Sequence, residues 1–145
     1  MKNLILLVTA ILLAVSAPFQ ANAQFNILKF ESSTSGKDTI RVYATQNRTM
    51  QLSLGGYYDA VAVTSTIERV GGVTLAGTYK LQKRLHSAAG WTDVPSTSYT
   101  VTNTTSQPVS WDLPAGIYGE LQVVYTGSGT GTGIAKSWAS AFKRK

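Results

Sequence analysis

Residues Ile117–Phe142, IYGELQVVYTGSGTGTGIAKSWASAF, decide the fold. Apolar and polar residues alternate on both sides of a glycine-rich stretch, Gly127–Gly133, as in two neighbouring strands. A glycine-rich loop can cradle a phosphate, but that geometry needs a following helix, and here a second alternating segment follows. We therefore predict a hairpin of strands 117–125 and 133–142. One face of each strand is predicted to carry Gly119, Leu121, Val123 and Tyr125, and Ile134, Trp138 and Phe142, respectively.

The chain between residue 24 and this hairpin shows the same period of two, interrupted by clusters of Gly, Ser, Thr, Asn and Pro. Apolar residues do not recur at the 3.6-residue spacing of an amphipathic helix. Short strands separated by turn residues indicate an all-β protein. We predict a single immunoglobulin-like or jelly-roll-like antiparallel β-sandwich. Its other strands are expected at 25–30, 39–44, 50–54, 60–70, 77–85, 91–94, 98–101 and 107–113.

The N-terminal residues are typical of an export signal. Lys2 precedes an apolar run, Leu4–Val15, and Ala21 and Ala23 form a small-x-small cleavage motif before Gln24. The run is shorter than the roughly 20 residues of a membrane-spanning helix, although an uncleaved anchor is the alternative. We expect a secreted or cell-surface protein without a transmembrane segment in its mature chain. Its predicted parts are a signal peptide (1–23), an N-terminal strand and flexible tether (24–37) and a β-sandwich domain (38–145).

The composition restricts how such a domain is stabilised. The chain has no cysteine and a formal net charge of +6. A small exported domain without disulfides depends on apolar burial, sheet closure or assembly with neighbours. The charge is compatible with acidic polysaccharide or anionic lipid, but the basic residues are mostly scattered, so no specific nucleic-acid partner is indicated.

The first predicted strand has two alternative partners. A polar segment, Glu31–Asp38, separates it from the rest of the chain. On such a tether the strand can pair within its own domain, or it can complete the sheet of a neighbouring molecule by strand exchange. The candidate donor residues for exchange are Phe25, Ile27, Leu28 and Phe30.

The sequence lacks the groups that most enzymes use. His86 is the single histidine and lies in a predicted loop without a nucleophile motif. The carboxylates are well separated, and Asp93 and Asp112 lie in turn contexts, where Asp bonds to nearby backbone. Clustered oxygen ligands of the calcium-binding kind are missing. We predict no enzyme, no metal and no cofactor, with a small secreted hydrolase as the most remote alternative.

Aromatic residues are better candidates for a function. Tyr57 and Tyr58 follow two glycines in a predicted turn, and Trp91 begins a short strand after a loop. Exposed rings can stack on sugar rings, so these three residues are the candidates for glycan stacking. Trp111 and Trp138 share faces with aliphatic residues, and we expect both to pack in the core.

Several motifs of the C-terminal half resemble a known kind of protein. They are GTYKLQ (Gly77–Gln82), GWTDVP (Gly90–Pro95), VTNTTSQ (Val101–Gln107), WDL (Trp111–Leu113) and LQVVYTGSGT (Leu121–Thr130). Over residues 73–145 this pattern resembles small β-sandwich structural proteins of bacteriophages, prophages and Bacteroidota surface assemblies. The resemblance implies a non-enzymatic module of virions, fibres or surface layers. The export signal departs from it, because virion proteins assembled in the cytoplasm need none.

Our first functional prediction is an exported structural protein that assembles with itself into a filament, fibre or surface layer, by N-terminal strand exchange. The alternatives are a secreted carbohydrate-binding module that binds a surface glycan and a phage-type virion decoration or fibre protein.

Overall fold

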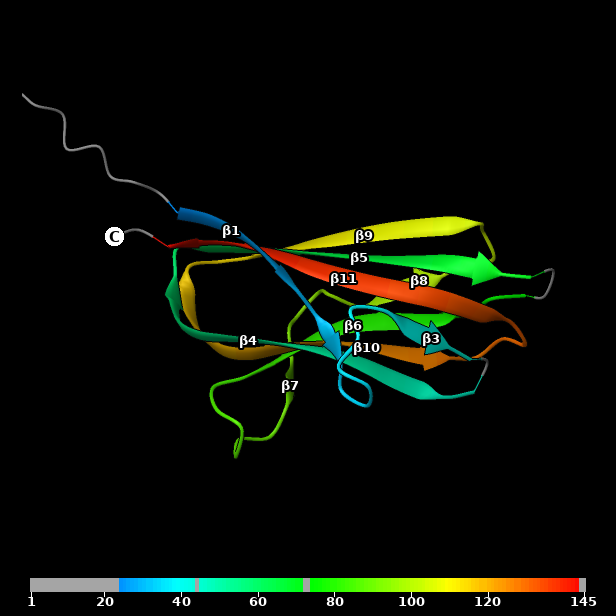
Figure 1. Cartoon of the computed structure of the whole chain (residues 1–145), viewed down its shortest axis with the longest axis horizontal. Helices are drawn as coiled ribbons and strands as arrows, with labels where there is room; N and C mark the ends of the chain where they lie inside the picture. The colour runs from blue at the N-terminus through cyan, green and yellow to red at the C-terminus, as the bar shows by residue number, and fades with distance from the viewer. Residues whose placement is uncertain (1–23, 44, 72–73, 144–145) are drawn as a thin grey trace, which may run out of the picture.

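The computed structural model describes residues 24–43, 45–71 and 74–143, so the predicted signal peptide with Ala21 and Ala23 lies outside them. The described residues form two antiparallel sheets packed face to face (Figure 1). The strands are β1 (Gln24–Lys29), β2 (Glu31–Ser32), β3 (Ile40–Val42), β4 (Asn47–Tyr58), β5 (Ala60–Val70), β6 (Gly77–Arg84), β7 (Thr92–Asp93), β8 (Tyr99–Val101), β9 (Ser106–Leu113), β10 (Gly116–Gly127) and β11 (Thr132–Lys143).

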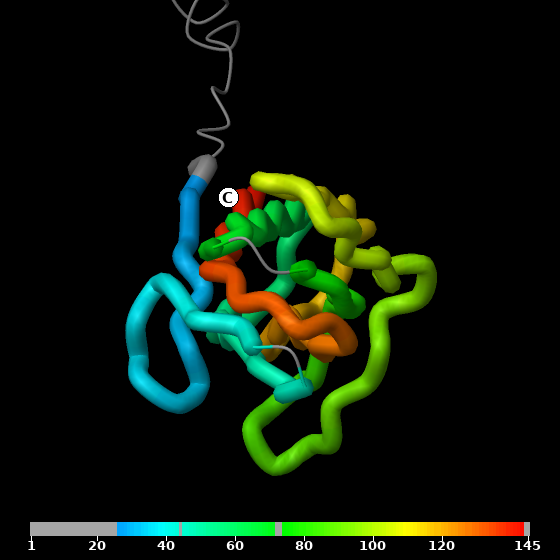
Figure 2. The backbone as a smooth tube through the Cα atoms, turned by 90° about the vertical axis from the view of Figure 1, so that its right-hand side faces the viewer, coloured from blue at the N-terminus to red at the C-terminus, as the bar shows by residue number. Residues whose placement is uncertain are grey.

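The two sheets have different strand orders. Sheet A has five strands in the order β1-β11-β5-β9, with β3 also paired to β11. Sheet B has six strands in the order β2-β4-β10-β6-β7, with β8 also paired to β6. The predicted all-β sandwich is confirmed. Two segments, 31–39 and 85–98, leave the body of the sandwich at different edges (Figure 2).

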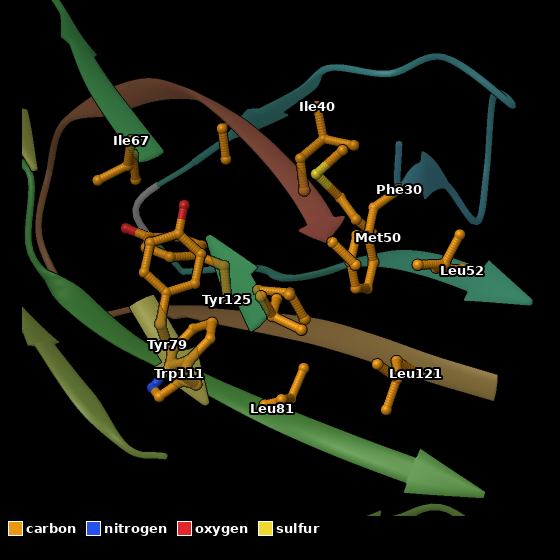
Figure 3. Packing of buried hydrophobic residues seen from close by; sticks show 14 of the residues in the cluster. Phe30, Ile40, Met50, Leu52, Ile67, Tyr79, Leu81, Trp111, Leu121 and Tyr125 are labelled. Carbon is orange, nitrogen blue, oxygen red and sulfur yellow. The ribbon is translucent and has the colours of Figure 1, made fainter. Parts of the chain in front are cut away.

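The core lies between the sheets and is filled by alternate residues of their inner faces (Figure 3). The rings of Tyr79 and Tyr125 meet edge to face with centroids 5.5 Å apart. The Tyr125 hydroxyl donates a 2.8 Å hydrogen bond to the carbonyl of Ala76, and burial raises the pKa of both hydroxyls. Trp111 is buried, as predicted.

The predicted hairpin between the last two strands is wrong. β10 pairs with β4 and β6 in sheet B, whereas β11 pairs with β5 in sheet A. The glycine-rich loop therefore carries the chain from one sheet to the other. Its backbone bonds to another segment, since Gly131 and Thr130 both donate to the carbonyl of Thr74. A Cβ at Gly131 would overlap the backbone of Thr74, so only glycine fits this approach.

The faces of β11 are also reversed from those expected. Its small residues point into the core, and Ile134, Trp138 and Phe142 share the outer face. The interior leaves no room for them, because a Cβ at Gly133 would already touch the side chains of Ile67 and Leu75. The predicted core position of Trp138 is therefore wrong.

The predicted turn at Tyr57 and Tyr58 is part of β4 instead. Gly55 has a φ of +65°, and the register between β4 and β10 shifts between Tyr118 and Glu120, which marks a β-bulge. Beyond the bulge Tyr58 packs against the core, and Tyr57 lies on the outer face, paired with Ile117.

The N-terminal strand pairs within its own domain. β1 lies along β11, with Leu28 opposite Ala139, and Phe30 is fully buried in the core. Ile27 is on the outer side and 68% exposed, and the Phe25 side chain is outside the described part of the chain. The segment predicted as a tether begins with β2, which pairs with β4. This is the intramolecular alternative of the two that the sequence left open.

Gly119 provides a test of how closely β10 approaches the end of β6. A Cβ at this position would overlap the Leu85 carbonyl, a backbone group that cannot turn aside. We expect Gly119→Ala to lower the free energy of unfolding by about 2 kcal/mol, because β6 and β10 must separate. Urea denaturation measures the difference. Gly90→Ala is the matched control, since a Cβ there meets nothing within 4 Å. Equal stability of the two variants would contradict the close approach of these strands.

Candidate functional site

The outer face of sheet B carries a row of hydrogen-bonded side chains that crosses four strands, here called the amide row. It starts on β4, where Gln51 Nε2 donates to Gln122 Oε1 at 3.2 Å. Gln122 Nε2 donates in turn to Gln82 Oε1, and Gln82 Nε2 donates to Asp93 Oδ1 at 2.6 Å. All three amides therefore donate in the same direction, from β4 towards β7. The row consists of Gln51, Gln122, Gln82 and Asp93.

The carboxylate at the end of the row is held by a cation. Lys80 Nζ lies 3.0 Å and 3.1 Å from the two Asp93 oxygens. The hydrogen bond from Gln82, and after it the one from Lys80, lowers the pKa of Asp93 below its ordinary value. Asp93 therefore stays ionised at neutral pH and fixes the orientation of the amides that donate towards it.

A second polar pair lies beside the amide row. Arg84 Nε donates to Glu120 Oε2 at 2.8 Å, and both side chains are largely buried. The Trp91 ring lies over the Arg84 guanidinium, 4.3 Å from ring centroid to Cζ. Trp91 belongs to the segment between β6 and β8, which extends past sheet B on the side away from sheet A (Figure 1). A half-buried indole therefore borders the polar row.

The same face ends in an apolar patch. Tyr57, Leu85 and Ile117 are 52%, 66% and 65% exposed, which is high for large apolar residues. Leu85 and Ile117 line a cavity of about 240 Å³ together with Arg84. The outer face of sheet B thus combines a fixed polar row, an ion pair under an indole and exposed apolar side chains. We call this combined surface the platform.

The structure brings together two of the three predicted stacking residues. Tyr57 and Trp91 both border the platform. Tyr58 is separate: its ring packs against the core, its hydroxyl donates to the Leu54 carbonyl, and Lys143 lies over the ring. His86 is exposed in the loop after β6. Within the described residues no group of three or more His, Cys, Asp or Glu side chains could hold a metal.

The glutamines of the amide row are absent from the sequence-based candidates. Each occupies an outward position of an alternating strand, which the sequence does indicate. Their alignment needs the cross-strand register, in which Gln122 stands opposite both Gln51 and Gln82. A sequence pattern alone contains no such register.

Asp93 allows a test of the amide row by pH. Its pKa is lower in the folded chain, so its ionised form stabilises the fold above the ordinary value of 3.8. This contribution is lost as the pH falls through the lower folded value. We expect Gln82→Leu to raise the Asp93 pKa towards 3.8, and Lys80→Gln to raise it as well. Carboxyl-carbon NMR titration measures both. Gln51→Leu, at the far end, serves as control, and an unchanged pKa in Gln82→Leu would contradict the bond.

No protein-family model matches the sequence, and no curated protein matches it. Among solved structures, the CBM22-1 xylan-binding domain of Paenibacillus barcinonensis Xyn10C is similar, with a TM-score of 0.51 and 12% identity over 86% of each chain. A carbohydrate-binding module of the CBM28 kind, specific for non-crystalline cellulose, has a TM-score of 0.50 and 10% identity over 80% of this chain and 79% of its own.

These neighbours correct the expected resemblance to phage and Bacteroidota surface-assembly proteins, because they are carbohydrate-binding modules. They also match most of the chain and not only its C-terminal half. The motifs behind the expectation include core and turn residues, such as Leu81, Leu113 and Leu121, which are buried here. Buried leucines at these positions are compatible with the core of any β-sandwich, so they do not identify one family. The chain therefore shares the sandwich fold of these carbohydrate-binding modules.

Proposed function

We propose that this protein is an exported carbohydrate-binding module whose platform binds a neutral polysaccharide chain. The observation that carries the proposal is the amide row, a line of fixed donors and acceptors on an outer sheet face. Export rests on the predicted signal peptide, which lies outside the described residues. No helix in the described part of the chain is long and apolar enough to cross a membrane.

The amide row suits a ligand with many hydroxyl groups. A glutamine side chain has two N–H donors and two acceptor lone pairs, and the row uses only some of them. The remaining groups can donate to and accept from neighbouring hydroxyls at once. Adjacent strands lie about 4.8 Å apart, so the row spans about 14 Å. Gln51, Gln82 and Asp93 are accessible to a ligand, and the buried Gln122 between them holds the two other amides in place. The groups repeat along a line, as the hydroxyls of a polysaccharide do.

The fixed orientation of the row favours binding. Gln122 is only 5% exposed, and its amide is bonded on both sides. Side chains that are already ordered lose little rotamer freedom when a ligand arrives. The hydrogen bonds of the row therefore act before binding, and the ligand meets a preorganised surface.

The apolar parts of the platform supply the remaining contact. Sugar rings have apolar C–H faces, and aromatic rings present large flat surfaces for them. Trp91 is held in place by the Arg84 guanidinium, and Tyr57 is exposed beside Ile117. Polar groups that orient a ligand, next to aromatic groups that cover it, are typical of binding sites.

The fold likeness supports the same proposal. The two similar structures are named for xylan and for non-crystalline cellulose, which are both polysaccharides. Self-assembly by strand exchange has less support, because Leu28 and Phe30 already fill the core of their own domain. Both similar structures are named as binding modules or domains, and we propose binding without catalysis here.

The first test removes the indole. On an array of neutral polysaccharides we expect binding by the unmodified chain, and for the best ligand we expect Trp91→Ala to weaken affinity about tenfold or more. Trp138→Ala is the matched control, since it removes an indole from the outer face of the other sheet. Thermal unfolding of both variants confirms that they fold. A blank array, or equal weakening by both variants, would refute the proposal.

The second test addresses the amide row. Gln122→Met keeps the shape of the side chain and removes its hydrogen bonds to Gln51 and Gln82. We expect an affinity loss of about fivefold to tenfold, because the remaining amides lose their fixed orientation. Calorimetry with the polysaccharide selected on the array measures it. Unchanged affinity would place the ligand elsewhere on the molecule.

A further inference from the structure

A second cavity lies at the other edge of the sandwich from Trp91. It has a volume of about 410 Å³ and is formed by the segment after β2, by β3 and by the start of β4. β2 and β7 are the opposite edges of sheet B, and Figure 2 shows segments 31–39 and 85–98 apart from each other. We call this space the basic cavity.

The charge of the basic cavity is one-sided. Lys37, Arg41 and Arg48 line it, and no Asp or Glu does. Asp38 is next to Lys37 in the chain, but its carboxylate pairs with Lys29 at 3.5 Å. Within the described residues, none of the three lining cations forms an ion pair. Three unneutralised cations around one space attract an anion.

Arg48 is the lining cation that has an unsatisfied hydrogen-bond donor. Its Nη2 donates to Gln46 Oε1 at 2.5 Å, and its guanidinium lies 5.6 Å from the centroid of the Tyr43 ring. These contacts hold the group in place. Its Nε is buried and has no hydrogen-bond partner among the described residues. An unsatisfied donor on a charged group is costly. Arg48 lines the cavity, so an anion there would lie beside its guanidinium and compensate its charge.

Hydroxyl groups complete the lining. Ser32 Oγ accepts the backbone N–H groups of Thr34 and Ser35 at 3.3 Å each, so its own hydrogen is free to donate in another direction. Thr39 and Thr49 also line the cavity. Cations and hydroxyls are the donors that proteins use for anionic oxygens.

We propose that the basic cavity binds a tetrahedral oxyanion, sulfate or phosphate, either free or as an ester on a polysaccharide. A guanidinium has five N–H donors and an ammonium three, and here they approach from three separate segments. A carboxylate offers two oxygens in one plane, whereas a tetrahedral oxyanion offers three or four that diverge. The donors of this cavity therefore match the tetrahedral group better. The proposal does not depend on glycan binding by the platform.

The test uses the full mature chain and four probes: inorganic sulfate, inorganic phosphate, dextran sulfate and unmodified dextran. We expect the backbone amide NMR signals of Thr34 and Ser35 to shift with sulfate, at constant ionic strength against chloride. We expect Arg48→Gln to weaken sulfate binding about tenfold, the effect of one charge-assisted hydrogen bond. Arg48→Lys should weaken it similarly, because lysine keeps the charge but lacks the planar guanidinium with its five N–H donors.

Lys143→Gln is the matched control. It removes one positive charge at the far end of β11 from Ile134, which lines the cavity. We expect less than a twofold change. Arg41→Gln repeats the test if Arg48→Gln does not fold, since Arg41 is exposed.

The outcomes separate the sources of the oxyanion. Binding of inorganic sulfate or phosphate supports a free ion, and binding of dextran sulfate alone supports an ester on a polysaccharide. Binding of neither would overturn the proposal, and so would equal weakening by Arg48→Gln and Lys143→Gln. Trp91→Ala should still bind the oxyanion, and Arg48→Gln should still bind a neutral polysaccharide, so failure of one proposal is distinct from failure of the other.

Discussion

The structure depends on the burial of large side chains between two sheets, against a β11 strand whose inner face is made of small residues. Ala135, Ala139 and Ala141 are almost fully buried on that face, and Tyr79, Tyr125 and Phe30 fill the space in the same core. Without disulfides, this apolar burial is the main stabilising term. The constraint also sets the connections: the glycine-rich loop must bring β11 across the core from β10, and β1 must close the edge of β11.

Because the core uses one face of each sheet, the other faces are free to serve a function. In sheet B the outer face is polar in the middle and apolar at one end, and the β-bulge at Gly55 separates the two parts. Tyr58 points to the core like Met50, Leu52 and Leu54 on the same face of β4, and Tyr57 points to the outside. The amides are fixed by one another and by the ionised Asp93, whose own orientation depends on Gln82 and Lys80. The platform is thus rigid because its polar groups satisfy one another across strands.

The two proposed sites differ in chemistry as well as in position. On the platform Lys80 is paired with Asp93 and Arg84 with Glu120, which leaves a surface suited to neutral hydroxyl groups. In the basic cavity the cations have no carboxylate partner within the described residues. The basic residues are scattered along the sequence, and the fold brings three of them, Lys37, Arg41 and Arg48, to one cavity.

The sequence by itself determined the strands and most of their faces. The period of two in Val61, Val63 and Ile67, and in Leu121, Val123 and Tyr125, places these residues in the core, because successive side chains of a strand point to opposite sides. It did not determine the partner of each strand. It also did not determine which face of β11 points inward, because the alternation separates the small residues from the large ones but does not say which set is buried. Only the tertiary structure decided that Trp138 faces outward, that Gln51, Gln122 and Gln82 form one row, and that Lys37, Arg41 and Arg48 surround one cavity. Those residues are far apart or irregularly spaced in the chain, and cross-strand register and sheet packing are what bring them together.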